Sequence, residues 1–172
     1  VLSIVKDGGA AYAALGTDGS KGRKLFCLSG AVAKPGIYEV EFGITLRQLI
    51  DLGGGMRGGS TMQAILLGGA AGGFVGPNDL DLPLTMEATR AAGSSLGSGV
   101  VMVLDQSVDM VDQLRRIAAF FRDESCGQCV PCRVGTVRQE EIVSRLAKGV
   151  QSQDIELLRE LGTVMRDASI CG

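Results

Sequence analysis

The chain contains no histidine and no tryptophan, and aromatic residues make up 4% of its 172 residues. Without histidine, a catalytic centre based on imidazole is excluded, and few rings are present to stack on nucleic-acid bases. The net charge of −2 also argues against a nucleic-acid partner, which favours a concentrated basic face. No apolar run approaches the length of a membrane-spanning helix, and no basic segment precedes a signal-type core. Neither nucleic-acid binding nor direct membrane insertion is therefore expected.

Cysteine is scarce in most of the chain and concentrated near its end. Of the five cysteines, Cys126, Cys129 and Cys132 are spaced three residues apart, and Cys171 follows much later. A tight loop can turn three thiolates at this spacing toward one point, whereas a regular helix cannot. Three clustered cysteines with one distant cysteine are a common ligand pattern for cuboidal iron–sulfur clusters. We call Cys126, Cys129 and Cys132 the loop cysteines.

Other interpretations of these cysteines stay open at this point. Zn²⁺ also binds four cysteines in closed structural sites, and the chain would then be a non-redox interaction module. Zinc sites, however, usually present two separated pairs of ligands. The cysteines are alternatively buried thiols or members of disulfides. Thiols that bind a cluster suit a reducing compartment, so the iron–sulfur interpretation predicts a cytoplasmic location, or the cytoplasmic face of a membrane reached through partner subunits.

The two ends of the chain suggest a fragment. The chain begins with Val1 rather than methionine and stops one residue after Cys171. A metal ligand so close to a true terminus would lie on backbone that frays. We therefore expect residues to be missing on both sides. A self-sufficient ferredoxin-like carrier is a further alternative, which these ends and the wide gap before Cys171 disfavour.

The composition changes near residue 105. Most of the 26 glycines and three of the four prolines precede this point, whereas a charged, helix-periodic pattern follows it. Two modules are the simplest interpretation. We expect a short leading segment over residues 1–23, an α+β unit over 24–104 and a helical unit over 105–172. The leading segment, with apolar Leu2, Ile4 and Val5, predicts a strand followed by a weak helix.

The α+β unit is predicted from alternating strands and turns. The expected strands are Lys24–Val32, Ile37–Phe42, Gln63–Leu67 and Val100–Leu104. Thr45 is the expected N-cap of a short helix that ends at a run of three glycines and turns Leu46, Leu49 and Ile50 to one side. The glycine-rich tract 68–73 lacks the Lys-Ser/Thr end of a phosphate loop, so a close-packed turn is favoured over nucleotide binding. Cys27, with apolar neighbours, is expected to be a small buried residue.

Three helices are predicted in the remaining residues. The first begins after Ser107, with acidic Asp109 and Asp112 near its N-terminus. Its inner face is expected to consist of Val108, Val111, Leu114, Ile117, Ala118 and Phe121. The cysteine loop is expected at 125–131, the second helix at 133–147 and the third at 154–166, capped by Ser152 or Gln153. The inner stripe of the third helix is expected to be Ile155, Leu158, Leu161 and Met165. Two antiparallel helices would then return Cys171 to the loop cysteines.

Residues 121–136, FRDESCGQCVPCRVGT, resemble the cluster-binding signature of the NADH-binding flavoprotein subunit of respiratory complex I. The same signature marks the homologous diaphorase subunits of NAD-linked formate dehydrogenases and of NAD-reducing or bifurcating hydrogenases. The segments 20–26, leading into Ser29 and Gly30, and 97–103 are also similar to this family. The closing segment 169–172 matches the place where the family supplies its fourth ligand. The resemblance covers nearly the whole chain and its cysteine motif is specific.

The resemblance implies a ubiquitin-like β-grasp domain of the SLBB type over 24–104, followed by a helical [4Fe–4S] domain over 105–172. Residues 1–23 would be the tail of a missing domain that binds FMN and NAD(H). Cys126, Cys129, Cys132 and Cys171 would carry a [4Fe–4S] cluster that exchanges single electrons with FMN in an NADH:acceptor oxidoreductase. The implied partners are other subunits of a redox complex, including a thioredoxin-like [2Fe–2S] subunit and a larger iron–sulfur subunit.

Residues beside the cysteines are expected to adjust the cluster. The hydroxyl of Ser125 and backbone N–H groups of the loop are expected to donate hydrogen bonds to sulfur. Gly127 would allow the backbone to come close, and Pro131 would stiffen the loop. Arg122 and Arg133 would either offset the negative charge of the cluster or form ordinary surface ion pairs. No catalytic residue is expected in this chain.

Overall fold

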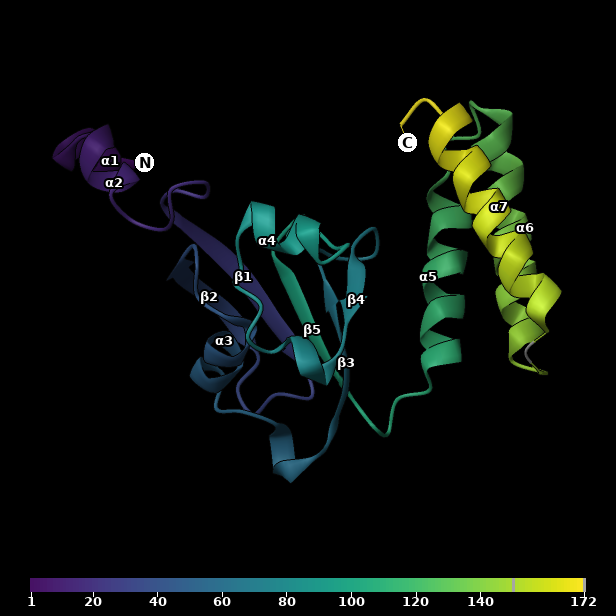
Figure 1. Ribbon diagram of the computed structural model, residues 1–172, viewed down its shortest axis with the longest axis horizontal. Helices are drawn as coiled ribbons and strands as arrows, with labels where there is room; N and C mark the ends of the chain where they lie inside the picture. Colours follow the sequence, from purple (N-terminus) through teal and green to yellow (C-terminus); the bar gives the residue numbers. More distant parts are fainter. Residues whose placement is uncertain (150, 172) are drawn as a thin grey trace. The chain divides into compact units, whose positions relative to one another are not determined.

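The computed structural model describes residues 1–149 and 151–171, which form two compact units, Val1–Ser107 and Val108–Gly172 (Figure 1). The first unit contains a five-stranded sheet and four α-helices: α1 (Leu2–Asp7), α2 (Gly9–Ala13), β1 (Arg23–Gly30), β2 (Gly36–Glu41), α3 (Leu46–Leu52), β3 (Met62–Leu67), β4 (Gly73–Val75), α4 (Met86–Ala91) and β5 (Val100–Asp105). The second unit contains three longer helices: α5 (Met110–Glu124), α6 (Val130–Leu146) and α7 (Ser152–Ala168). The expected α+β class is therefore confirmed.

The leading segment differs from its prediction. Where a strand followed by a weak helix was expected, the structure has the short helices α1 and α2. A strand needs a neighbouring strand for its backbone hydrogen bonds, and the described sheet offers none to residues 1–22. A helix instead pairs its backbone N–H and C=O groups within the segment. The N–H of Val5, for example, donates a hydrogen bond to the carbonyl oxygen of Val1. Local hydrogen bonding therefore decides the structure here.

The sheet has the strand order β2-β1-β5-β3-β4. β1 and β2 form an antiparallel hairpin, β1 pairs in parallel with β5, and β3 pairs antiparallel with both β5 and β4. The four predicted strands are present with boundaries shifted by two residues or fewer, whereas the short β4 was not predicted. A parallel pair of the first and last strands, flanked by hairpins, is the arrangement expected of the β-grasp resemblance.

The core of this unit lies between one face of the sheet and α3. Thr45 caps α3 through a capping box with Gln48, and Leu46, Leu49 and Ile50 are buried as predicted. They belong to one cluster with inward residues of β1, including Phe26. The opposite face of the β1–β2 pair leaves large apolar side chains exposed, among them Leu25 and Ile37.

The prediction that Cys27 is buried is wrong, because the Cys27 side chain is exposed. Successive residues of a strand point to opposite faces of a sheet. Phe26 and Leu28, on either side of Cys27, are fully buried, so Cys27 must point to the other face. Apolar neighbours in the sequence indicated a buried strand but not which of its two faces would be covered.

The glycine-rich tract connects β3 to β4 as a tight turn, as predicted. A Cβ atom at Gly72 would lie 1.5 Å from the Leu67 carbonyl oxygen, so only glycine fits there. Among the described residues, no α-helix begins after this turn until Met86, so the turn presents no helix N-terminus to an anion. The tract is a structural turn.

The second unit is formed by α5, α6 and α7, which lie side by side (Figure 1). Asp109 caps α5 by accepting hydrogen bonds from the N–H groups of Val111 and Asp112. Ala118 of α5 and Ile142 and Val143 of α6 are buried between the helices. Leu114, which was expected on the inner face of α5, is 38% exposed. The predicted inner face of α5 is therefore broader than the face that α6 covers.

Candidate metal centre

The loop cysteines lie at the junction of α5 and α6. Cys126 is exposed in the connecting loop, Cys129 is the N-cap of α6, and Cys132 lies in the first turn of α6. The helix was expected from Arg133, but it begins at Val130, so the loop is shorter than predicted. Pro131 explains the difference, because proline has no N–H to lose and a suitable φ in the first turn of a helix.

The start of α6 is a favourable place for thiolate ligands. The first N–H groups of a helix have no partner within the helix and carry a partial positive charge. Cys129 and Cys132 both lie at this end, and no side chain caps it by a hydrogen bond. Two of the four thiols therefore lie at the end of α6 that attracts negatively charged groups.

Ser125 and Gly127 shape the loop in front of these cysteines. The Ser125 hydroxyl accepts a hydrogen bond from the N–H of Gly127 at 3.3 Å and lies 3.3 Å from the sulfur of Cys132. The hydroxyl hydrogen is thus available for that sulfur. Gly127 has a φ of 75°, in the left-handed region that favours glycine. A Cβ there would meet only Arg133 Cδ at 3.9 Å, so backbone conformation, rather than shortage of space, requires the glycine.

The fourth cysteine is carried back to the loop by α7. The N–H of Ile170 lies 3.5 Å from the sulfur of Cys129, within the range of an N–H···S hydrogen bond. Ile170 directly precedes Cys171, so the segment after α7 reaches the cysteine loop 41 residues earlier in the chain. The prediction that two antiparallel helices return the chain to the loop is therefore confirmed.

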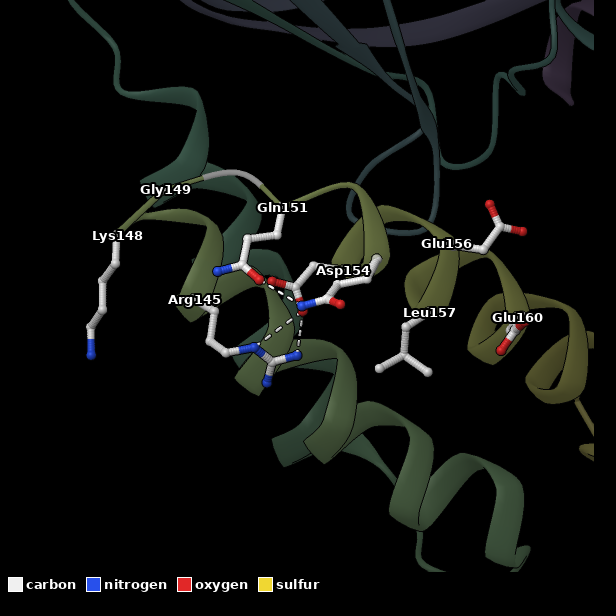
Figure 2. A pocket seen from close by; sticks show the side chains of 9 residues that line it. Arg145, Lys148, Gly149, Gln151, Asp154, Glu156, Leu157 and Glu160 are labelled. Atoms are coloured by element: carbon white, nitrogen blue, oxygen red, sulfur yellow. Dashed lines mark hydrogen bonds and ion pairs between the residues drawn. The ribbon is translucent and has the colours of Figure 1, made fainter.

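The third helix begins earlier than predicted. Ser152 or Gln153 was expected as its N-cap, but α7 starts at Ser152 and its N-cap is Gln151, whose side chain does not cap the helix backbone by a hydrogen bond. Asp154 instead orders this end, since its carboxylate accepts two hydrogen bonds from Arg145 at 2.6 and 3.2 Å (Figure 2). The contact raises the pKa of the Arg145 guanidinium, chiefly through the hydrogen bond to Asp154. This pair joins the end of α6 to the start of α7.

A hollow of about 1080 Å³ opens beside the same pair. Figure 2 shows the side chains around it, including Lys148, Leu157 and Glu160. It lies at the opposite end of the 17-residue helix α6 from the cysteines, which corresponds to about 25 Å along a helix of that length. The hollow is therefore separate from the candidate metal centre.

All five cysteines are free thiols, so none is held in a disulfide. Within the described residues, no three cysteine or carboxylate side chains are grouped closely enough to hold a metal ion as they stand. The segments that carry them nevertheless meet, as the contacts of Ser125 with Cys132 and of Ile170 with Cys129 show. Metal binding commonly completes the folding of such loops. Four thiols on one loop and one returning segment are a donor set that fits a cubane iron–sulfur cluster.

Two further residues support the centre, and neither was predicted from the sequence. Thr136 is buried, and its hydroxyl donates a hydrogen bond of 2.9 Å to the carbonyl of Cys132. Gly135 is also buried, and an added Cβ would lie 2.5 Å from the sulfur of Met165 in α7. Residues three and four positions after a helical residue lie on the same side of the helix, so the sequence could have placed Gly135 and Thr136 beside Cys132. It did not, because the predicted helix began after Cys132.

Comparison with known proteins finds a matching family model for part of each unit. Residues 112–172 match the NADH-ubiquinone oxidoreductase-F iron-sulfur binding region, and residues 25–74 match the SLBB domain. NADP-reducing hydrogenase subunit HndC of Solidesulfovibrio fructosivorans is 37% identical over 174 residues, which cover 100% of this chain and 36% of that protein. An NADH-quinone oxidoreductase subunit of Rhizobium meliloti is 40% identical over 163 residues, which cover 94% of this chain and 39% of that protein.

A solved structure matches in its fold as well as its sequence. The crystal structure of an NAD⁺-reducing [NiFe]-hydrogenase in the H₂-reduced state contains a chain that superposes with a TM-score of 0.84 at 38% identity. The match covers 97% of this chain and 28% of that one. The chain thus spans well under half the length of these relatives. In the described part of the chain, no helix has the length and apolar character needed to cross a membrane.

Proposed function

We propose that this chain, which belongs to the NADH-binding flavoprotein subunits of NADH-quinone oxidoreductases and related hydrogenases as a C-terminal part, is the electron-transfer portion of such a protein. In this proposal the loop cysteines and Cys171 bind a [4Fe–4S] cluster. The contact between Ile170 N–H and the sulfur of Cys129 carries the proposal, because it joins the fourth cysteine's segment to the loop.

A [4Fe–4S] cluster bound at these thiols supplies one-electron transfer. The protein's own contribution is to hold the ligands and set the surrounding charge. The Ser125 hydroxyl lies 3.3 Å from the sulfur of Cys132 and would donate to it once that sulfur is a thiolate ligand, and the N–H of Ile170 is directed at Cys129. Hydrogen bonds to ligand sulfurs favour the form with more negative charge on the sulfurs, so both contacts would raise the reduction potential. Thr136 fixes the backbone of Cys132 in the first turn of α6.

We extend the proposal to the longer protein that the relatives represent. Its remaining part would bind FMN and NAD(H), and single electrons would pass between the flavin and the cluster. Residues 1–23 would end that flavin domain, 24–104 would form the SLBB-type β-grasp domain, and 105–172 would form the cluster domain. The partners would be other subunits of a redox complex, including a thioredoxin-like [2Fe–2S] subunit and a larger iron–sulfur subunit, in the cytoplasm or at the cytoplasmic face of a membrane.

The proposal is tested by analysing the metal content of the anaerobically purified protein. We expect four iron atoms and four acid-labile sulfides per chain at this site, because that is the composition of a cubane cluster. Electron paramagnetic resonance of the reduced protein should show a [4Fe–4S] signal that depends on the four cysteines. Zinc without labile sulfide would instead establish a structural zinc site with four thiolate ligands and overturn the redox function.

A further inference from the structure

Two arginines flank the cysteine loop, and the structure gives them different surroundings. Arg122, at the end of α5, forms ion pairs with Asp123 and with Glu140 of α6. Hydrogen bonds to Asp123 and then Glu140 raise the pKa of its guanidinium. Two carboxylates face this one positive charge, so its field is offset locally. Arg122 therefore serves to join α5 to α6.

Arg133 differs from Arg122 in its partners. Among the described residues, no ion pair of this side chain is found within 4.0 Å. Its guanidinium instead donates a hydrogen bond of 2.8 Å to the carbonyl oxygen of Gly127. A neutral carbonyl orients the guanidinium without cancelling its charge. The positive charge of Arg133 thus stays available to other negative groups nearby.

The position of Arg133 directs this charge toward the cysteine loop. Arg133 follows Cys132 in the first turn of α6, and its side chain reaches back to a residue between Cys126 and Cys129. The hydrogen bond therefore closes the loop against the helix start. Gly127 itself is held in a left-handed conformation, so this carbonyl has a defined direction. One side chain thereby combines an orienting contact with an uncompensated positive charge beside the loop cysteines.

We propose that Arg133 is a positioning residue that closes the cysteine loop and raises the reduction potential of the cluster through its uncompensated charge. The proposal rests on the proposed function, because it requires an iron–sulfur cluster at these cysteines. Reduction adds one negative charge to a cluster that is already negative with its four thiolates. A nearby cation stabilises the reduced form more than the oxidised form, so removing the cation disfavours reduction.

The test compares three variants of the intact holoprotein by redox titration monitored with electron paramagnetic resonance. Arg133→Gln removes the charge, Arg133→Lys retains it, and Arg138→Gln is a matched control. Arg138 is exposed on the same helix, about one and a half turns further on, and pairs with Glu141. At the midpoint potential of the wild-type cluster, Arg133→Gln should lower the ratio of reduced to oxidised cluster about two- to fivefold, as expected for one charge near water.

The Lys and control variants decide between charge and structure. We expect Arg138→Gln to leave the ratio unchanged and Arg133→Lys to stay near the wild-type value. Hydrogen exchange of the amides of residues 125–129 should rise in both Arg133 variants, since neither reproduces the planar guanidinium contact with Gly127. Loss of the cluster in the Gln variant with retention in the Lys variant would equally support a requirement for charge.

Two results would overturn the inference. Equal ratios in Arg133→Gln and Arg138→Gln would show that the charge of Arg133 does not reach the cluster. Equal shifts in Arg133→Gln and Arg133→Lys would assign the effect to loop geometry instead. Failure of the proposed function is distinguishable from both, because wild-type protein would then lack iron and labile sulfide before any variant is titrated.

Discussion

Gly135 offers a quantitative test of how α6 and α7 are spaced around the candidate centre. It lies in α6, and replacing it with alanine adds one Cβ, which would lie 2.5 Å from the sulfur and 2.7 Å from Cγ of Met165. This is about 1 Å short of ordinary van der Waals contact. Met165 belongs to the helix that leads to Cys171, so relief of the clash would move the side chain or the helix.

The magnitude follows from two opposing effects. Replacing glycine by alanine inside a helix stabilises a protein by about 0.5–1 kcal/mol, because alanine loses less conformational freedom on folding. Overpacking a buried contact costs about 1–3 kcal/mol. We therefore expect Gly135→Ala to destabilise the second unit by about 0–2.5 kcal/mol. Truncating the neighbour with Met165→Ala removes the clash, so in that background Gly135→Ala should stabilise by about 0.5–1 kcal/mol.

The assay is a double-mutant cycle on the intact holoprotein. The free energy of opening of the helical unit is measured by hydrogen exchange of α6 amides. The expected coupling energy between the two positions is about 1–3 kcal/mol, within the range found for residues in contact. A coupling energy near zero, with Gly135→Ala stabilising in both backgrounds, would refute the close contact of α6 with α7 and the return of Cys171 that depends on it.

The remaining predictions concern the cluster, the two units and acid stability. Serine at any loop cysteine should abolish or shift the cubane signal in electron paramagnetic resonance, because an alkoxide is a poor substitute for thiolate, whereas Cys27→Ser should leave it intact. Destruction of the cluster should raise hydrogen exchange first and most in residues 108–170, since about 65 residues form a marginal core; equal loss in both units would contradict this. The complete protein should oxidise NADH with an artificial acceptor, whereas this chain alone should not, and activity of the chain alone would show that the nucleotide site was misplaced. The Ser20 hydroxyl donates to Glu87 at 2.7 Å and lowers the pKa of that carboxyl. This contact therefore stabilises the fold above the unfolded pKa of Glu87 and is lost as pH falls through the folded value, so Ser20→Ala should reduce the acid-induced rise in hydrogen exchange around α4.

The sequence by itself determined the features that depend on neighbouring residues in the chain. The N-cap at Thr45, the glycine turn after β3 and four of the five strands of the sheet follow from local hydrogen bonding and side-chain period. The helical period after residue 107 likewise predicted a returning pair of helices, whereas the shared centre that the spacing of the loop cysteines predicts stays a prediction. These patterns repeat within a few residues, so no distant partner is needed to recognise them.

Only the tertiary structure decided which surfaces and charges meet. Cys27 is exposed because α3 covers the other face of β1, and strand period alone does not say which face is covered. Arg122 and Arg133 both flank the cysteine loop, and the sequence does not distinguish their roles. In the structure, Glu140 offsets the charge of Arg122, whereas Arg133 donates a hydrogen bond to the carbonyl of Gly127. The contact of Ile170 with Cys129 joins residues that are 41 positions apart. Such partners depend on how separate helices pack, which is a property of the whole fold rather than of any short segment.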